Sequence, residues 1–195
     1  KELCAFDKWI LSKLQNIINL STEYFEIYEY SKSKHETEKF FWQTFCDNYL
    51  EIIKDRLYNP DSRGINERKS AQYTLYNVLL TILKLTAPIM PHITEEIYHL
   101  YFKNKENLAS IHVSNWPISD SNLTNLKLEE IGDQLIDVIS KVRKYKSEKQ
   151  LSLKESINLL SLDMNENEVQ PFIEDLKSTT KSKKIEFTKE FSLKL

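Results

Sequence analysis

The chain has 195 residues, and its 27 Lys and Arg against 29 Asp and Glu give a formal net charge of −2. Hydrophobic residues make up 41% and charged residues 29%, a composition typical of a globular protein that buries a sizeable core. Two glycines argue against a Gly-rich phosphate loop and against an all-β fold with many tight turns.

The predicted elements begin with a long helix over about residues 3–27 and a second helix over FFWQTFCDNYLEIIKDRL (residues 40–57), with a charged segment between them. Apolar residues recur at helical spacing in both helices. In the first helix they are Leu3, Phe6, Ile10, Leu14, Ile17 and Phe25. In the second helix they are Trp42, Cys46, Tyr49, Leu50, Ile53 and Leu57. The second helix is expected to end before NPDSRG, whose Pro60 and Gly64 mark a turn.

A third helix is predicted from about Glu67 to Thr86, and two prolines follow it. Pro88 ends this helix, because proline disfavours helical geometry at the preceding residue and lacks the N–H that continuation needs. Pro91 is suited to the first position of the next helix, where an N–H has no partner anyway. Glu95 and Glu96 then favour the positive end of that helix. The prolines therefore predict a tight corner between antiparallel helices.

Beyond the corner, residues 104–117 are expected to be irregular or briefly extended, with Trp116 holding this segment to the helical body. Together with Trp9 and Trp42, Trp116 is expected to anchor the core. A long helix is predicted from about Asn125 to Lys149, because apolar residues repeat there at alternating steps of three and four.

The tail changes to a mixed pattern. SINLLSL (156–162) and KIEFT (184–188) are predicted strands, a short helix is predicted near residues 169–176, and FSLKL (191–195) is consistent with a third strand. We therefore predict a mainly α fold, an antiparallel helix bundle followed by a small α/β C-terminal appendage. The division places a helical domain at 1–118 and a long helix with the α/β module at 119–195.

The ends of the chain and its cysteines bear on where the protein acts. No apolar run reaches the length of a membrane span, and KELCAFDKWI lacks the apolar core and cleavage site of a signal peptide. An initial Met is also missing, which suggests a piece of a longer chain. Cys4 and Cys46 lack a metal or redox spacing, so we expect two reduced thiols in a cytoplasmic protein.

Few residues suggest catalysis or metal binding. His92, Glu96 and His99 fall on one helix face, which is a possible zinc arrangement, but the metalloprotease spacing HExxH is absent. Serines flank His112, yet no G-x-S-x-G elbow accompanies them. We therefore predict neither a catalytic residue nor a metal site, and a metal-dependent hydrolase built on His92 and His99 is the third hypothesis.

Local clusters of positive charge give the stronger signal. KVRKYKSEK (141–149), at the end of the long helix, holds five cations and an aromatic side chain, and DRLYNPDSRGINERK (55–69) surrounds a turn. Such clusters suit an RNA backbone with an unstacked base nearby, although cations at a helix C-terminus are also stabilised by the helix dipole alone. KSTTKSKK (177–184) adds four lysines. The candidate RNA contacts are Arg56, Arg63, Arg68, Lys69, Lys141, Arg143, Lys144, Tyr145 and Lys146.

Several stretches together resemble the C-terminal region of class I valyl-tRNA synthetases. DKWILSKL (7–14) resembles D-R-W-I-L-S-R-L, and FWQTFCDNYLEIIK (41–54) resembles W-x-x-F-C-D-W-Y-L-E. LLTILKLTAPIMPHITEEIY (79–98) resembles L-L-x-L-L-H-P-x-M-P-F-I-T-E-E-I-Y, and SIHVSNWP (110–117) resembles S-I-x-x-x-x-W-P. VRKYKSEKQLSL (142–153) is similar to a stretch of the archaeal-type subgroup. The recognisable motifs span about residues 5–162.

The chain also departs from the family pattern. Asn48 replaces a Trp and His92 replaces a Phe, which puts the local packing there in doubt. The first helix of the family domain (N-K-L-W-N-A-x-R-F) and the catalytic signatures H-I-G-H and K-M-S-K-S are absent. The resemblance thus implies that this chain alone does not activate valine.

The resemblance implies a helical anticodon-binding domain that holds a valine tRNA by its anticodon stem-loop. It implies no cofactor in this chain, and ATP and magnesium for the full-length valine–tRNA ligase. It also implies a cytoplasmic monomer without a membrane partner. The alternative is a helical protein-interaction module with no RNA partner, which would differ in its weaker response to salt.

Overall fold

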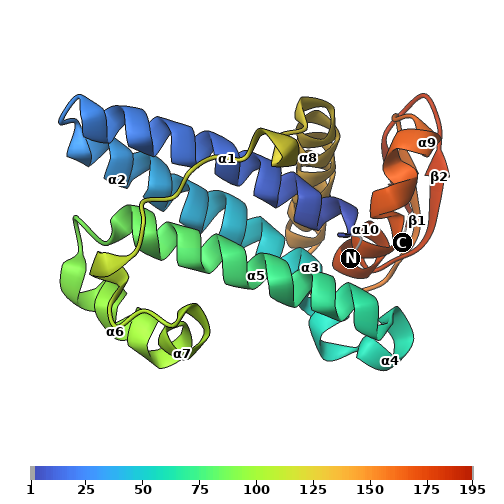
Figure 1. Cartoon of the computed structure of the whole chain (residues 1–195). Coiled ribbons are helices and arrows are strands. Elements are labelled where there is room, and N and C mark those ends of the chain that lie inside the picture. The colour runs from blue at the N-terminus through green and yellow to red at the C-terminus, as the bar shows by residue number, and fades with distance from the viewer. Residues whose placement is uncertain (1–2, 195) are drawn as a thin grey trace. The chain divides into compact units, whose positions relative to one another are not determined.

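The computed structural model describes residues 3–194 and is mainly helical, with a small sheet near the C-terminus (Figure 1). The helices are α1 (Ala5–Glu26), α2 (Tyr30–Lys39), the π-helix η1 (Phe40–Tyr49), α3 (Leu50–Tyr58), α4 (Pro60–Arg63), α5 (Ile65–Thr86), α6 (Pro91–Tyr101), α7 (Lys103–Glu106), α8 (Leu126–Glu148), α9 (Glu166–Val169) and α10 (Ile173–Thr180). Short 3-10 turns are η2 (Ile111–Val113), η3 (Ser121–Leu123) and η4 (Gln170–Phe172). The strands are β1 (Ile157–Leu162), β2 (Ser182–Phe187) and β3 (Ser192–Lys194). The predicted fold class is confirmed.

The chain forms two compact units that each combine distant stretches of sequence. The described part of unit 1 comprises residues 3–9, 48–71 and 125–194, and unit 2 comprises residues 10–47 and 72–124. The predicted domain boundary between residues 118 and 119 divides the chain by sequence and stays a prediction. In the part of the chain that is described, no helix is both long and apolar enough to cross a membrane.

The α/β tail of unit 1 is a three-stranded sheet with β1 in the centre. β1 pairs in parallel with β2 and antiparallel with β3. The parallel pair follows from α10, because parallel neighbours need a crossover connection and this helix lies between them in sequence. Ile157, Leu160 and Leu162 of β1 are buried, and Phe172 meets Phe6 of α1 edge to face at 4.8 Å between ring centroids.

Trp9 joins α1 to α8 within unit 1. Its side chain is 1% exposed, and its Nε1 donates a hydrogen bond to Asp133 at 2.9 Å. Gly132 makes this close approach possible, because a Cβ at that position would overlap Cδ1 of Trp9 and lie 2.7 Å from its Nε1. The single glycine of α8 is therefore a packing requirement.

Replacing Gly132 with Ala is expected to destabilise the protein by about 1–3 kcal/mol, because the indole is held on both sides and must shift. This cost should exceed the gain of about 1 kcal/mol that the same change gives in an exposed helix. Urea unfolding followed by circular dichroism measures the difference. Ser140→Ala, at an exposed position of α8, is the control and should be nearly neutral; equal stability of both variants would contradict the packing role.

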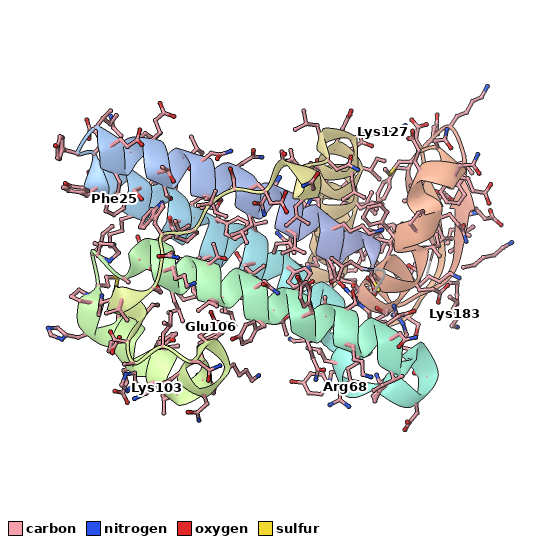
Figure 2. The ribbon with its side chains drawn as sticks, viewed as in Figure 1. Phe25, Arg68, Lys103, Glu106, Lys127 and Lys183 are labelled. Atoms are coloured by element: carbon pink, nitrogen blue, oxygen red, sulfur yellow. The ribbon has the colours of Figure 1, made fainter. Side chains whose placement is uncertain are left out.

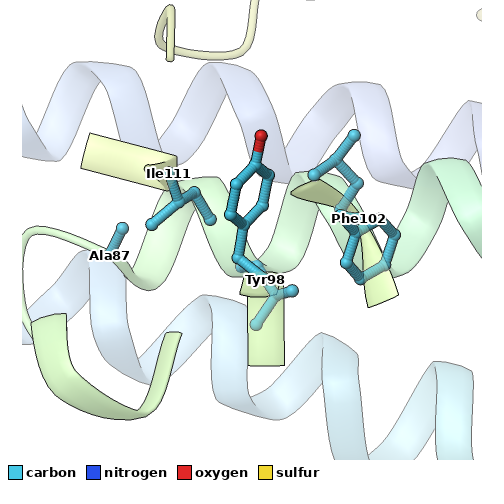
Figure 3. Packing of buried hydrophobic residues seen from close by; sticks show 6 residues of the cluster. Ala87, Tyr98, Phe102 and Ile111 are labelled. Carbon is cyan, nitrogen blue, oxygen red and sulfur yellow. The ribbon is translucent and has the colours of Figure 1, made fainter. Parts of the chain in front are cut away.

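The proline corner of unit 2 lies at the predicted place in the chain, and the antiparallel direction of its helices stays a prediction. α5 ends at Thr86, and Pro91 stands at the first position of α6. Both helices bury apolar residues against η2 in one cluster, which Figure 3 shows around Tyr98 and Phe102. The cluster consists of Leu80, Leu83, Ala87, Tyr98, Phe102 and Ile111. The prolines thus set a turn that lets two helices share one apolar core.

Glu95 has a more specific role than the predicted stabilisation of a helix terminus. It accepts hydrogen bonds from Ser110 Oγ at 2.9 Å and from the Ile111 N–H at 3.0 Å, and it pairs with His99 at 2.9 Å. Burial alone would raise the pKa of Glu95, but these hydrogen bonds outweigh it and lower the pKa. Glu95 therefore fastens the segment after α7 to α6.

The prediction that Trp42 anchors the core is wrong, and η1 explains why. A π-helix closes i→i+5 hydrogen bonds, so the buried face no longer follows the spacing of an α-helix. Phe40 and Phe45, five residues apart, are 4% and 2% exposed, whereas Trp42 is 60% exposed. Trp116 does pack as expected, with its Nε1 donating to Thr22 Oγ1 at 2.9 Å.

Candidate nucleic-acid interface

The nine residues predicted to contact RNA all lie in unit 1, on α3 to α5 and on α8. The structure separates them into buried residues with internal partners and residues at the surface. Figure 2 shows Arg68 on the first turn of α5, where its side chain is half-buried and its Nε is buried. Lys69 beside it is exposed. An RNA contact by either cation stays a prediction.

Arg56 is a structural residue. Its side chain has no exposed surface and binds Asp7 through two parallel hydrogen bonds, both 2.8 Å long. Asp7 also accepts hydrogen bonds from Tyr49 at 2.6 Å and from Ser70, and Nε of Arg56 lies 3.2 Å from Asp175. Burial would lower the pKa of Arg56, but the two carboxylates outweigh it and raise the pKa. The prediction that Arg56 contacts a phosphate is therefore wrong.

Arg63 extends this network toward the surface. Its guanidinium lies 2.6 Å from Asp175, 2.8 Å from Glu67 and 3.0 Å from Asp55, and the side chain is 11% exposed. An RNA phosphate would have to displace a carboxylate to reach it. Asp175 of α10 thus bridges Arg56 and Arg63, which fixes the α/β tail to α3 and α4 within unit 1.

The cations of α8 differ in what surrounds them. Lys144 is 78% exposed, and its ammonium group lies 3.9 Å from Glu148, so the two form a weak surface ion pair. Lys141 is exposed, and its ammonium lies 5.3 Å from the centre of the Phe191 ring. Arg143 and Tyr145 are half-buried. An RNA contact by these four side chains stays a prediction.

Lys146 is buried, contrary to the expectation that it contacts a phosphate. It is 1% exposed, and its Nζ donates to the carbonyls of Leu153, Glu155 and Thr180 at 3.1, 2.7 and 2.9 Å. These three bonds use every donor of the ammonium group. Burial lowers the pKa of Lys146, and the nearby charge of Lys181 lowers it further. Lys146 is therefore a hub that ties the end of α8 to the loop after it and to α10.

A pocket of about 360 Å³ lies beside Lys146 in unit 1. The ends of α3, α8 and α10 and the loop after α8 form its walls. It is lined by Glu51, Lys54, Asp55, Tyr58, Asn59, Arg143, Lys146, Leu153, Lys154, Ser178, Thr179 and Lys181. Lys54, Tyr58 and Lys154 were not among the predicted contacts; α3 and the loop after α8, which carry them, come together only in the fold. We call this the basic pocket.

Unit 2 carries a larger groove of about 630 Å³ between α2, η1, α5 and α6. Trp42 and Tyr101, which are 60% and 68% exposed, line it together with aliphatic residues of α5 and α6. Lys105 is also in its wall and lies over the Tyr76 ring at 5.1 Å. A large apolar hollow with exposed aromatic side chains is typical of an interaction surface.

The histidines of α6 are used in ways that do not resemble a metal centre. His99 pairs with Glu95 and lies 3.0 Å from the carbonyl of Ala109. Within residues 3–194 no group of three or more His, Cys, Asp and Glu side chains is placed to hold a metal ion. Both cysteines are free thiols, and burial raises the pKa of Cys4.

Comparison with known proteins connects this architecture to a family. Residues 7–161 match the family described as "Anticodon-binding domain of tRNA ligase". The chain belongs to this family. The match covers unit 2, much of unit 1 and nearly all of β1, so this anticodon-binding domain includes both the proline corner and the long helix α8.

Relatives of the anticodon-binding domain are bacterial enzymes named valine–tRNA ligase. The chain is 41% identical to that of Rickettsia canadensis over 186 residues, which is 93% of this chain and 22% of the relative. It is 43% identical to that of Rickettsia rickettsii over 183 residues (93% and 22%), and 45% identical to that of Ehrlichia ruminantium over 151 residues (77% and 18%). The chain therefore spans about a fifth of these relatives. Their bacterial sources give no support to the predicted archaeal-type subgroup.

Proposed function

We propose that the chain is the tRNA anticodon-binding portion of a valine–tRNA ligase, the enzyme that joins valine to its tRNA at the expense of ATP. The family match over residues 7–161 carries this proposal, and the similarity to valine–tRNA ligases supports the choice of amino acid. ATP and magnesium would act in a part of the enzyme outside this chain. A cytoplasmic monomer is the state that we propose for it.

Positive charge at the surface supports the contact with RNA. Lys141 and Lys144 on α8 and Lys69 on α5 are exposed although the whole chain is slightly acidic. Exposed ammonium groups bind phosphates as point charges and release counterions from RNA, which makes the binding sensitive to salt. The exposed aromatic residues of unit 2 offer surfaces on which unstacked anticodon bases can stack.

The proposal predicts that the 195-residue chain binds the anticodon stem-loop of a valine tRNA more tightly than the same stem-loop with its anticodon replaced. Affinity should fall at least tenfold between about 50 and 200 mM salt, because several phosphates are contacted. Fluorescence anisotropy with a labelled stem-loop measures both. Lys141→Glu with Lys144→Glu should weaken binding, and Lys127→Glu, at the other end of α8, is the control.

Two outcomes would count against the function. Equal affinity for both stem-loops would remove anticodon recognition from this chain. Failure to bind either RNA at low salt would remove the RNA partner altogether. Binding of a protein with little response to salt would then favour the interaction-module alternative, with the apolar groove of unit 2 as its surface.

A further inference from the structure

We infer that the basic pocket of unit 1 binds a backbone phosphate of single-stranded RNA, with Tyr58 stacking on the adjacent base. The inference rests on the proposed function and adds a contact site that the sequence does not predict. Its cations come from α3, α8, the loop after α8 and the residue that follows α10, which are brought together by the fold. It also replaces Arg56 and Lys146, which are buried, by residues that a ligand can reach.

The lining of the pocket has an excess of positive charge. Five cations face two carboxylates, which gives a formal charge of +3 in a chain whose net charge is −2. The cations are Lys54, Arg143, Lys146, Lys154 and Lys181, and the carboxylates are Glu51 and Asp55. Low-dielectric walls focus such a charge, so the pocket attracts anions even though the whole protein does not.

Helix ends reduce this excess without removing it. α3, α8 and α10 all end at the pocket, and each helix C-terminus carries about half a negative charge, roughly −1.5 in total. The three partial charges account for some of the cations, because a helix C-terminus is stabilised by Lys or Arg. They do not account for all of them. About +1.5 remains, which is close in size to the single negative charge of a phosphate diester.

Lys146 contributes charge but does not contact the ligand. Its three donors are used by carbonyls, and within the described residues no carboxylate forms an ion pair with it. Burial lowers its pKa, and the nearby charge of Lys181 lowers the pKa further. An anion between them would relieve this repulsion.

Lys154 and Lys181 are the side chains best placed to donate to a phosphate. Both are exposed, and among residues 3–194 neither ammonium group is in an ion pair. Lys54 is paired with Glu51 across one helical turn, an exposed pair that a phosphate can replace at little cost. Two free cations and one exchangeable cation are thus available.

Tyr58 supplies the aromatic surface. It is the last residue of α3, lines the pocket and is 77% exposed. Exposed aromatic rings next to a cationic groove are the arrangement with which proteins hold single-stranded RNA, since the ring stacks on a base while the cations bind the backbone. A double helix would keep its bases stacked on one another and leave this ring unused.

The test compares variants of the 195-residue chain in their binding to the valine tRNA anticodon stem-loop. Lys154→Gln with Lys181→Gln should lower the affinity about tenfold and reduce the slope of log affinity against log salt by about 0.7 to 1.4. Tyr58→Ala should lower the affinity by about fivefold or more, and Tyr58→Phe should retain it, because stacking needs the ring and not the hydroxyl.

The control variant removes the same number of positive charges at another place in unit 1. Lys127→Gln with Lys184→Gln removes two exposed cations that pair with Glu168 and Glu186 and do not line the pocket. This variant should keep most of the affinity. Thermal unfolding of each variant confirms that the fold is intact, since all the changed side chains are exposed.

Each result has a definite meaning. If the unchanged chain binds RNA and the pocket variants behave as the control does, the pocket assignment is overturned and the proposed function stands. If the unchanged chain binds no RNA at low salt, both are overturned. If inorganic phosphate binds at the pocket in an NMR titration while the variants leave RNA affinity unaltered, the pocket is a site for free anions and the RNA assignment is overturned.

Discussion

Replacing Arg56 with Met is expected to destabilise the protein by about 3–5 kcal/mol, the largest effect of any single change considered. The substitution removes the guanidinium that binds Asp7 through two hydrogen bonds and also contacts Asp175, and neither carboxylate is more than 6% exposed. Asp7 would stay buried without its counter-charge, and Asp175 would keep only Arg63 as a partner. The free energy of unfolding of a typical domain is about 5–15 kcal/mol, so much of the stability would be lost. Urea unfolding at neutral pH measures the change.

A second substitution and a change of pH separate this electrostatic effect from lost packing. Asp7→Asn in the Arg56→Met background should recover about 1 kcal/mol or more, because it removes one of the stranded charges. Burial already raises the pKa of Asp175. Without Arg56 that pKa should rise further, so the folded variant binds a proton that the unfolded chain does not. The difference in unfolding free energy between the unchanged protein and Arg56→Met should therefore become smaller as pH falls from about 7 to 5. A deficit that is independent of pH would indicate packing alone.

Replacing Lys146 with Met is expected to cost about 3 kcal/mol, because three carbonyls, of which that of Thr180 is buried, lose a charged donor at once. The variant no longer buries a charge at this position, which offsets part of this loss of stability. Lys144→Met is the matched control on the same helix, and its change should lie within about 0.5 kcal/mol of zero because the side chain is 78% exposed. Similar stabilities for the two variants would contradict the role of Lys146 as a hub.

The pH dependence of Lys146 has the opposite sign to that of an ion-paired lysine, whose pKa is raised. Burial lowers the pKa of Lys146 in the folded state, so the unfolded chain holds this proton more tightly. Folding is therefore penalised below the folded pKa, and the penalty disappears as pH rises toward the unfolded value of about 10.4. The stability of the unchanged protein relative to Lys146→Met should increase as pH rises toward that value. A flat or falling difference would show that the ammonium is not strained by its burial.

Helical periodicity and proline chemistry allowed most of the fold to be predicted. The first helix, the proline corner, the long helix α8 and the strand–helix–strand tail all lie where the sequence indicates. The prediction failed at Trp42, because apolar spacing was read with the α-helical period and η1 has another. A π-helix depends on how the surrounding helices pack, and ten residues of local sequence do not specify it.

The candidate site was less predictable, because burial of a cation depends on partners that are distant in sequence. Nothing near Arg56 in sequence indicates that Asp7 and Asp175 will contact it, and nothing near Lys146 indicates that the Thr180 carbonyl will accept a hydrogen bond from it. A cluster of charge in the sequence therefore contains both buried structural cations and cations that a ligand can reach. The tertiary structure makes this distinction by burial.

Unit 1 has a consequence for how the protein matures. Trp9 and Asp133 are 124 residues apart, and Arg63 and Asp175 are 112 apart. Unit 2 also joins distant residues, since Trp116 and Thr22 are separated by 94. During translation unit 2 can therefore close only after about residue 124 has emerged, and the start of α1 has its partners in unit 1 only after α10 has emerged. Expression of residues 7–161 alone would omit Asp175 and should yield an incompletely folded, protease-sensitive product.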